Sequence, residues 1–161
     1  MNRIIIKKFI GLSIILTTIC GCNMKNTLQQ ESKILAKLII FPTGVEFETY
    51  IIELKSNGTI CTAFGEANEL VIKQPKSYKE QKLSDVFSSL QKMVEALPKE
   101  PIAKDAKIYK GGWEFILSIP KTKKQYHGNF QDVEEIDKGV INFIRQLIKL
   151  SPIKVDMHGW S

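Results

Sequence analysis

The sequence predicts an α+β domain, in which an antiparallel sheet of about five to seven strands carries two helices packed on one face. Three observations lead to this prediction. A β-hairpin signal lies in the first half of the chain, a second run of alternating apolar residues lies in the second half, and a segment with helical spacing of apolar residues follows each of them. A hairpin followed by a helix therefore occurs twice, which indicates an internal duplication, with coincidence as the alternative.

The clearest hairpin signal is Asn57-Gly58, which lies between two runs of β-forming residues within 47–65. Asn-Gly favours the two-residue loop of a type I′ turn, because both of its loop positions take a positive φ. A loop of two residues also fixes which residues lie opposite each other in the two strands. The predicted register pairs Lys55 with Ile60, Leu54 with Cys61, Ile52 with Ala63 and Ile51 with Phe64.

This register divides the side chains of the hairpin between two faces. Leu54 and Cys61 are expected on the apolar face, so a buried, small apolar side chain is the favoured interpretation of Cys61. A catalytic or redox thiol is the alternative. Ile51 and Phe64 are expected together on the opposite face.

A second hairpin is predicted from the alternating segment 113–120 and the segment 125–130. A four-residue loop, 120–123, pairs Ile116 with His127 on the face that points away from the core. The two hairpins therefore contribute side chains to the same outer face of the predicted sheet.

The remaining segments complete the predicted sheet and its helical layer. The Ile- and Leu-rich run 34–41 predicts a strand, with a short helix as the alternative at this length. Apolar residues at helical spacing predict helices over 84–97 and over 132–150, where Asp132 begins a capping box. The segment 152–157 is expected to add a last edge strand.

Length and charge fit one domain that does not bind nucleic acid. The chain has 161 residues and a formal net charge of +6. Residues 1–21 hold three basic and no acidic side chains, so the remainder has 20 basic and 17 acidic side chains, a charge of +3. Nucleic-acid binding needs a denser basic stripe than this mild charge supplies. We expect a polar tether over 22–33 and a single α+β domain over 34–161.

The N-terminal segment has the organisation of a secretion signal. Arg3, Lys7 and Lys8 precede a mainly apolar run, 9–19. A membrane-spanning helix needs about 20 apolar residues, so this run is too short to cross a bilayer. We therefore expect residues 1–21 to be a signal peptide that is removed.

The signal ends in Ile19-Cys20-Gly21-Cys22, which resembles the lipobox of bacterial lipoproteins. The resemblance implies cleavage before Cys22 and lipidation of its thiol, with an ordinary secretory signal or a short membrane anchor as the alternatives. Cys20 fits poorly, because its use requires cleavage after Ile19, where the signal peptidase of this class needs a small residue. Two or three acyl chains give stable anchoring to a membrane.

Lipid anchoring implies a location in the cell envelope. In this family an aspartate after the lipidated cysteine signals retention in the inner membrane of some bacteria, and Asn23 stands at that position here. A host with two membranes would therefore carry the protein on its outer membrane. With Cys22 lipidated and Cys20 removed, Cys61 is the remaining thiol, so no disulfide within the chain is predicted.

The sequence contains no catalytic constellation. It lacks a nucleophile elbow, a Gly-rich phosphate loop and paired histidines at helical spacing. His127 and His158 are expected to be surface histidines. The alternative is a metal site formed by Glu114, His127 and His158. No cofactor, metal or enzymatic activity is therefore predicted. The lysines of 73–82 and 99–110 are expected in solvated loops, with contact to lipid headgroups or peptidoglycan as the alternative.

The face of the sheet without helices is expected to present apolar side chains with a polar rim, unless loops cover it. This pattern predicts a non-enzymatic, lipid-anchored protein that binds an envelope protein, as an accessory subunit or inhibitor. The expected contact residues are Ile51, Phe64, Ile116 and His127. The functional alternative is a carrier or sensor of a small apolar or lipidic ligand, held between sheet and helices beside Cys61, Trp113 and Phe115.

Overall fold

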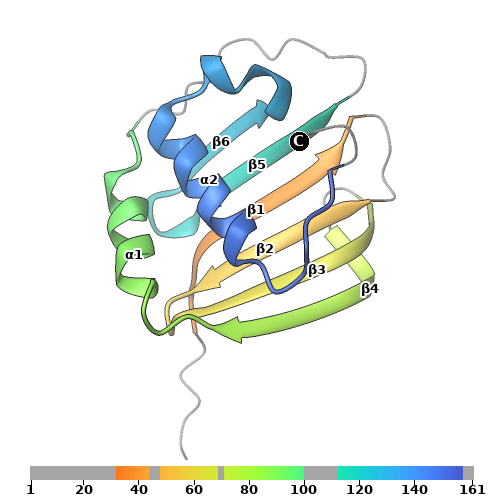
Figure 1. The fold of residues 1–161 in the computed structure, drawn as a ribbon, viewed down its shortest axis with the longest axis horizontal. Coiled ribbons are helices and arrows are strands. Elements are labelled where there is room, and N and C mark those ends of the chain that lie inside the picture. The colour runs from red at the N-terminus through yellow and green to blue at the C-terminus, as the bar shows by residue number, and fades with distance from the viewer. Residues whose placement is uncertain (1–31, 44–47, 69–70, 100–111, 158–161) are drawn as a thin grey trace, which may run out of the picture. The chain divides into compact units, whose positions relative to one another are not determined.

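Six antiparallel strands form one open sheet in the order β4-β3-β2-β1-β5-β6 (Figure 1). The structure is a computed structural model, and it describes residues 32–43, 48–68, 71–99 and 112–157. The strands are β1 (Ile34–Pro42), β2 (Thr49–Lys55), β3 (Thr59–Asn68), β4 (Val71–Lys82), β5 (Trp113–Ile119) and β6 (Lys124–Asn129). The described residues also form two α-helices, α1 (Phe87–Ala96) and α2 (Lys138–Leu150). The predicted α+β architecture is confirmed.

Both helices lie on the same face of the sheet (Figure 1). Alternate residues of β1, β2, β5 and β6 point towards them, and these side chains form one core with Leu90 of α1 and with Phe143, Ile144 and Leu147 of α2. The residues between them in sequence point to the other face. We call that other face the open face, because neither α1 nor α2 packs on it.

The turn at Asn57-Gly58 differs from the predicted one. Gly58 has a φ of 77°, whereas Asn57 is not among the described residues with a positive φ. The Gly58 amide donates to the carbonyl oxygen of Lys55 over 3.0 Å, so the loop between β2 and β3 spans three residues, 56–58. A three-residue loop of this kind ends in a left-handed glycine, and it moves the register by one residue.

The new register exchanges the faces of β3. Cys61 lies opposite Glu53, Ala63 opposite Ile51, and Phe64 opposite Tyr50. Cys61 therefore lies on the open face, where it is nevertheless buried, and the prediction that it faces the helices is wrong. Phe64 lies on the helix side, where its ring packs on Tyr50 with 4.5 Å between centroids. The predicted pairing of Ile51 with Phe64 is wrong for the same reason.

Strand β4 replaces the predicted connector 73–82. It pairs with β3 and forms an edge of the sheet. An edge strand tolerates Pro75, because one side of its backbone needs no partner, and the pairing shifts register near this residue. The second hairpin has the predicted register, with Ile116 opposite His127.

The second helix begins later than predicted. Residues 130–135 form a 3-10 helix in which Asp132 has non-helical angles, so Asp132 is not the cap of α2. Asp137 is the N-cap, and its Oδ1 accepts from the amides of Gly139 and Val140. The segment 152–157 is not the expected strand, and it packs on the helix side of the core.

Candidate functional site

A row of six side chains crosses the open face, one from each strand. Cross-strand pairing places them in the order Tyr78, Ala63, Ile51, Ile39, Ile116 and His127, from β4 to β6. Ile39 is 7% exposed and Ile51 9%, while Ala63 and Ile116 are half-buried. Tyr78 and His127 are exposed at the two ends. The row is therefore apolar in the middle and polar at both ends.

The structure brings together three of the four predicted contact residues. Ile51, Ile116 and His127 belong to this row, and they come from β2, β5 and β6. Phe64 lies on the other side of the sheet and is not part of the open face. Sequence reasoning missed Ile39 and Tyr78, because β1 was placed without a register and β4 was not recognised as a strand.

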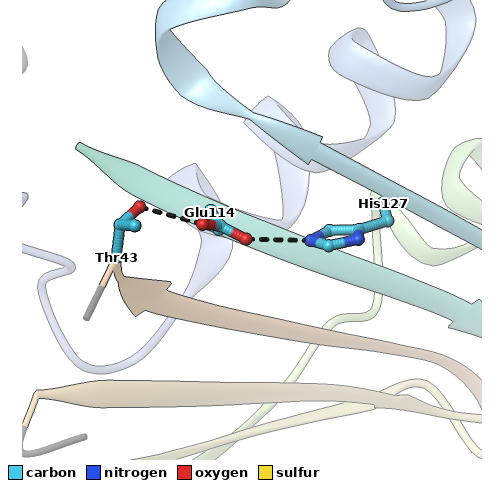
Figure 2. A network of polar contacts seen from close by, with 3 residues as sticks. All are labelled: Thr43, Glu114 and His127. Carbon is cyan, nitrogen blue, oxygen red and sulfur yellow. Dashed lines mark hydrogen bonds and ion pairs between the residues drawn. The ribbon is translucent and has the colours of Figure 1, made fainter. Parts of the chain in front are cut away.

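Glu114 organises the β6 end of the row (Figure 2). One carboxylate oxygen, Oε2, lies 3.0 Å from Nε2 of His127, and the other, Oε1, accepts a hydrogen bond of 2.9 Å from the hydroxyl of Thr43. Thr43 follows β1, Glu114 is in β5 and His127 is in β6, so the network connects three strands. Glu114 and His127 alternate with core residues along their strands, and this alternation places both on the open face.

A second polar cluster lies at the β4 end of the open face. The thiol of Cys61 donates to Oε2 of Glu80 over 3.7 Å, and the hydroxyl of Tyr78 donates to the same oxygen over 3.3 Å. Cys61, with smaller contributions from burial and Glu80, raises the pKa of Tyr78 well above its ordinary range. Cys61 likewise raises the pKa of Lys55, which favours the protonated amine.

Charged groups of the open face are thus paired with neighbours on the same face. Lys37 of β1 forms an ion pair of 3.6 Å with Glu53 of β2, in the strands between the two polar clusters. A polar group that already has a partner costs less to bury than one that must give up water without replacement. The open face can therefore be covered by an apolar surface at a moderate cost.

The residues named for the ligand-carrier alternative do not line a common cavity. Trp113 and Phe115 lie in the core between sheet and helices, whereas Cys61 lies on the open face. A surface hollow of about 270 Å³ exists elsewhere, lined by residues from 133 to 145 of the 3-10 helix and α2. Its apolar lining comes from Val133, Ile136 and Ile141.

The described part of the chain contains neither a metal-binding cluster nor a helix that could span a membrane. No group of three or more His, Cys, Asp or Glu side chains is arranged to hold a metal ion there. None of its helices has the length and apolar character that crossing a membrane requires. His158 and the predicted lipidation site, Cys22, lie outside the described residues.

Comparison with known proteins adds no family to these observations. The sequence matches no protein-family model, and no curated protein sequence is significantly similar to it. Inference about function therefore rests on the N-terminal motif and on the geometry of the open face.

Proposed function

We propose that the protein is a lipid-anchored, non-enzymatic component of a bacterial cell envelope that binds a protein partner through the open face. The observation that carries this proposal is the apolar row on the face that neither helix covers, in which the half-buried Ala63 and Ile116 flank the buried Ile39 and Ile51. The lipobox resemblance at Cys22 supports the location, on the outer membrane where the host has two. The partner has an apolar patch of its own, because the centre of the row offers no hydrogen-bonding side chain.

The distribution of polar groups supports binding to a protein. A protein interface has an apolar centre and a polar rim that supplies hydrogen bonds. The open face has this arrangement, with Tyr78 and Glu80 at one end and His127 and Glu114 at the other. The exposed imidazole of His127 is available to a partner at the β6 end, whereas Tyr78 lies on the edge strand β4 at the other end.

In-cell crosslinking with the full-length chain tests the proposal. A photoreactive residue is placed at position 116 in β5 on the open face, and in a second sample at Val86, which is 40% exposed beside α1. The expected result is one dominant crosslinked protein from position 116 and none from position 86. In a second experiment the photoreactive residue is placed at position 127, and Ile116→Lys in that chain should lower the crosslink to the partner about tenfold, as expected for a residue within an interface.

A matched variant separates lost binding from lost folding. Val86→Lys introduces the same charge on the helix side of the domain, and it should leave the crosslink unchanged. Ile116→Lys must retain the circular dichroism spectrum and unfold in one transition. Equal crosslinking by wild type and Ile116→Lys, with both folded, would exclude the open face as the binding surface.

A further inference from the structure

Strand β4 gives one edge of the sheet a basic character. Its sequence, VIKQPKSYKEQK, contains four lysines and one glutamate, a charge of +3. The strand pairs with β3 on one side, and almost all of its side chains are exposed. Lys79 lies opposite Thr62 on the helix side, whereas Lys82 lies opposite Thr59, three positions further on. Residues three apart in a strand point to opposite faces, so the lysines flank the free edge on both sides.

The positive charge of β4 is only partly neutralised by the domain. Lys76 forms an exposed ion pair of 3.7 Å with Glu66, and Lys82 donates to the carbonyl oxygen of Asn57. For Lys73 and Lys79 the described residues provide no hydrogen bond or ion pair. The edge therefore presents amines that can bind anionic groups outside the protein.

Exposed apolar side chains accompany these lysines. Val71 is 56% exposed and Tyr78 is 54% exposed, and they are two of the three large apolar side chains exposed in the described part of the chain. Lysines on an edge strand have a structural explanation, because their charge prevents the strand from pairing with the sheet of another molecule. Exposed Tyr and Val work against that protection. Lysine together with exposed Tyr is typical of a surface that contacts lipid headgroups.

Strand β1 begins at the same end of the sheet at which β4 stops. The Ser56 amide donates to the carbonyl oxygen of Lys33 over 2.7 Å, and the Leu83 amide donates to that of Gly58 over 2.8 Å. The residue before β1 and the residue after β4 therefore both contact the β2–β3 loop. A lipid attached upstream of Lys33 would therefore tether the domain from the end of the sheet at which the last lysines of β4 lie.

We propose that the free edge of β4 is a membrane-contact surface that binds anionic lipid headgroups through its lysines, with Tyr78 and Val71 at the headgroup level. This inference rests on the membrane anchoring in the proposed function, and it adds the orientation of the domain. The edge of β4 faces the bilayer. The open face then stands at an angle to the membrane, where a partner can reach it.

Hydrogen exchange of the full-length chain in vesicles tests this inference. The chain is reconstituted into vesicles of phosphatidylcholine alone and of phosphatidylcholine mixed with phosphatidylglycerol. Amides of 71–82 should exchange about fivefold more slowly in the anionic vesicles, which corresponds to about 1 kcal/mol, the gain of a single lysine at an anionic surface. About 1 M NaCl should remove the difference, because the Debye length falls to about 3 Å.

Two charge variants make the result specific. Replacing the lysines of β4 with Gln, in K73Q/K76Q/K79Q/K82Q, should abolish the slower exchange. A control with the same net charge, K92Q/K121Q/K149Q/K154Q, changes exposed lysines outside β4 and should retain it. Unchanged exchange of 71–82 in anionic vesicles, or an equal effect of both variants, would overturn the inference. Lipid attachment is measured separately from the mass of the N-terminal fragment, so failure of the proposed anchoring is distinguishable.

Discussion

Tyr126 connects β6 to the segment that follows α1. Its ring is buried on the helix side of the sheet, and its hydroxyl donates to the carbonyl oxygen of Pro98 over 2.6 Å. Burial, and to a smaller extent the charge of Asp137, raises the pKa of Tyr126 above its ordinary value of 10. The folded state therefore disfavours the phenolate, and the domain should lose stability in alkali.

The sign of this pH dependence follows from linkage. The folded pKa of Tyr126 lies above the unfolded one, so its contribution is fully present below about pH 10 and is lost as the pH rises through the folded pKa. Tyr126→Phe should lower the free energy of unfolding by about 1 kcal/mol at pH 7, because a hydrogen bond is lost. The variant should also show a shallower decline above about pH 10 in urea denaturation.

Two other groups contribute to the same alkaline loss. Lys55 and Tyr78 also have raised pKa values, and the folded state therefore keeps their protons to higher pH than the unfolded state does. Some decline should remain in Tyr126→Phe for this reason. A decline identical to that of the wild type would show that Tyr126 does not contribute.

Phe64 packs on the helix side because the loop at Asn57-Gly58 has three residues, whereas Ile116 lies on the open face as predicted. Both side chains are half-buried, but Phe64 packs on Tyr50 and the core, whereas Ile116 lies on the open face. Phe64→Ala should lower the free energy of unfolding by about 2–3 kcal/mol, and Ile116→Ala by about 1 kcal/mol. Chemical denaturation of the two variants measures this difference. A loss for Phe64→Ala no larger than that for Ile116→Ala would indicate that Phe64 lies on the open face, as the two-residue loop requires.

At the scale of elements, the start of α2 depends on packing that local sequence does not reveal. The stretch 132–137 contains two aspartates, and both are good N-cap residues. Ile136 adopts an extended conformation between the 3-10 helix and α2. A Cβ at Gly128 would lie 2.6 Å from Cδ1 of Ile136, so the isoleucine packs directly on the β6 backbone. This contact interrupts the helix and leaves Asp137 as the cap.

The two aspartates give a matched test of the helix start. Asp137→Ala should lower the free energy of unfolding by about 1 kcal/mol, because the amides of Gly139 and Val140 lose their acceptor. Asp132→Ala should change it by less than about 0.5 kcal/mol, since Asp132 caps no described α-helix. Thermal or urea unfolding of both variants provides the measurement. The reverse order would mean that α2 begins at Asp132.

Strand β4 shows why an edge strand is hard to predict. Its lysines and Pro75 argue for a loop when the segment is considered alone. In the fold, the backbone of β3 requires a partner, and an edge position accepts lysines on both faces and a proline. Long-range pairing therefore decides the conformation, and a local pattern cannot.

For the whole molecule, periodicity was sufficient to predict the layers but not the faces. The alternating residues of β5 and the helical spacing in α2 each report on their own segment, so the two-layer architecture follows from them. The side chains of β3 that lie on the open face depend on one additional loop residue. This residue places Cys61 on the open face and Phe64 on the helix side, each the reverse of the prediction. The candidate site was thus predicted for Ile51, Ile116 and His127 and not for the residues of β4.

Membrane attachment through Cys22 is the prediction that determines where all these surfaces act. If the lipobox is used, metabolic labelling with a radioactive fatty acid should mark the protein, and the mature chain should begin at residue 22. Cys22→Ala should remove the label and release the domain from the membrane fraction, because the acyl chains supply the anchoring free energy. Cys20→Ala is the matched control, and it should retain both label and cleavage, since Cys20 lies in the part that is removed. A label that persists in Cys22→Ala and disappears in Cys20→Ala would assign lipidation to the other cysteine. Absence of label in the wild type would indicate an ordinary secretory signal or a short membrane anchor.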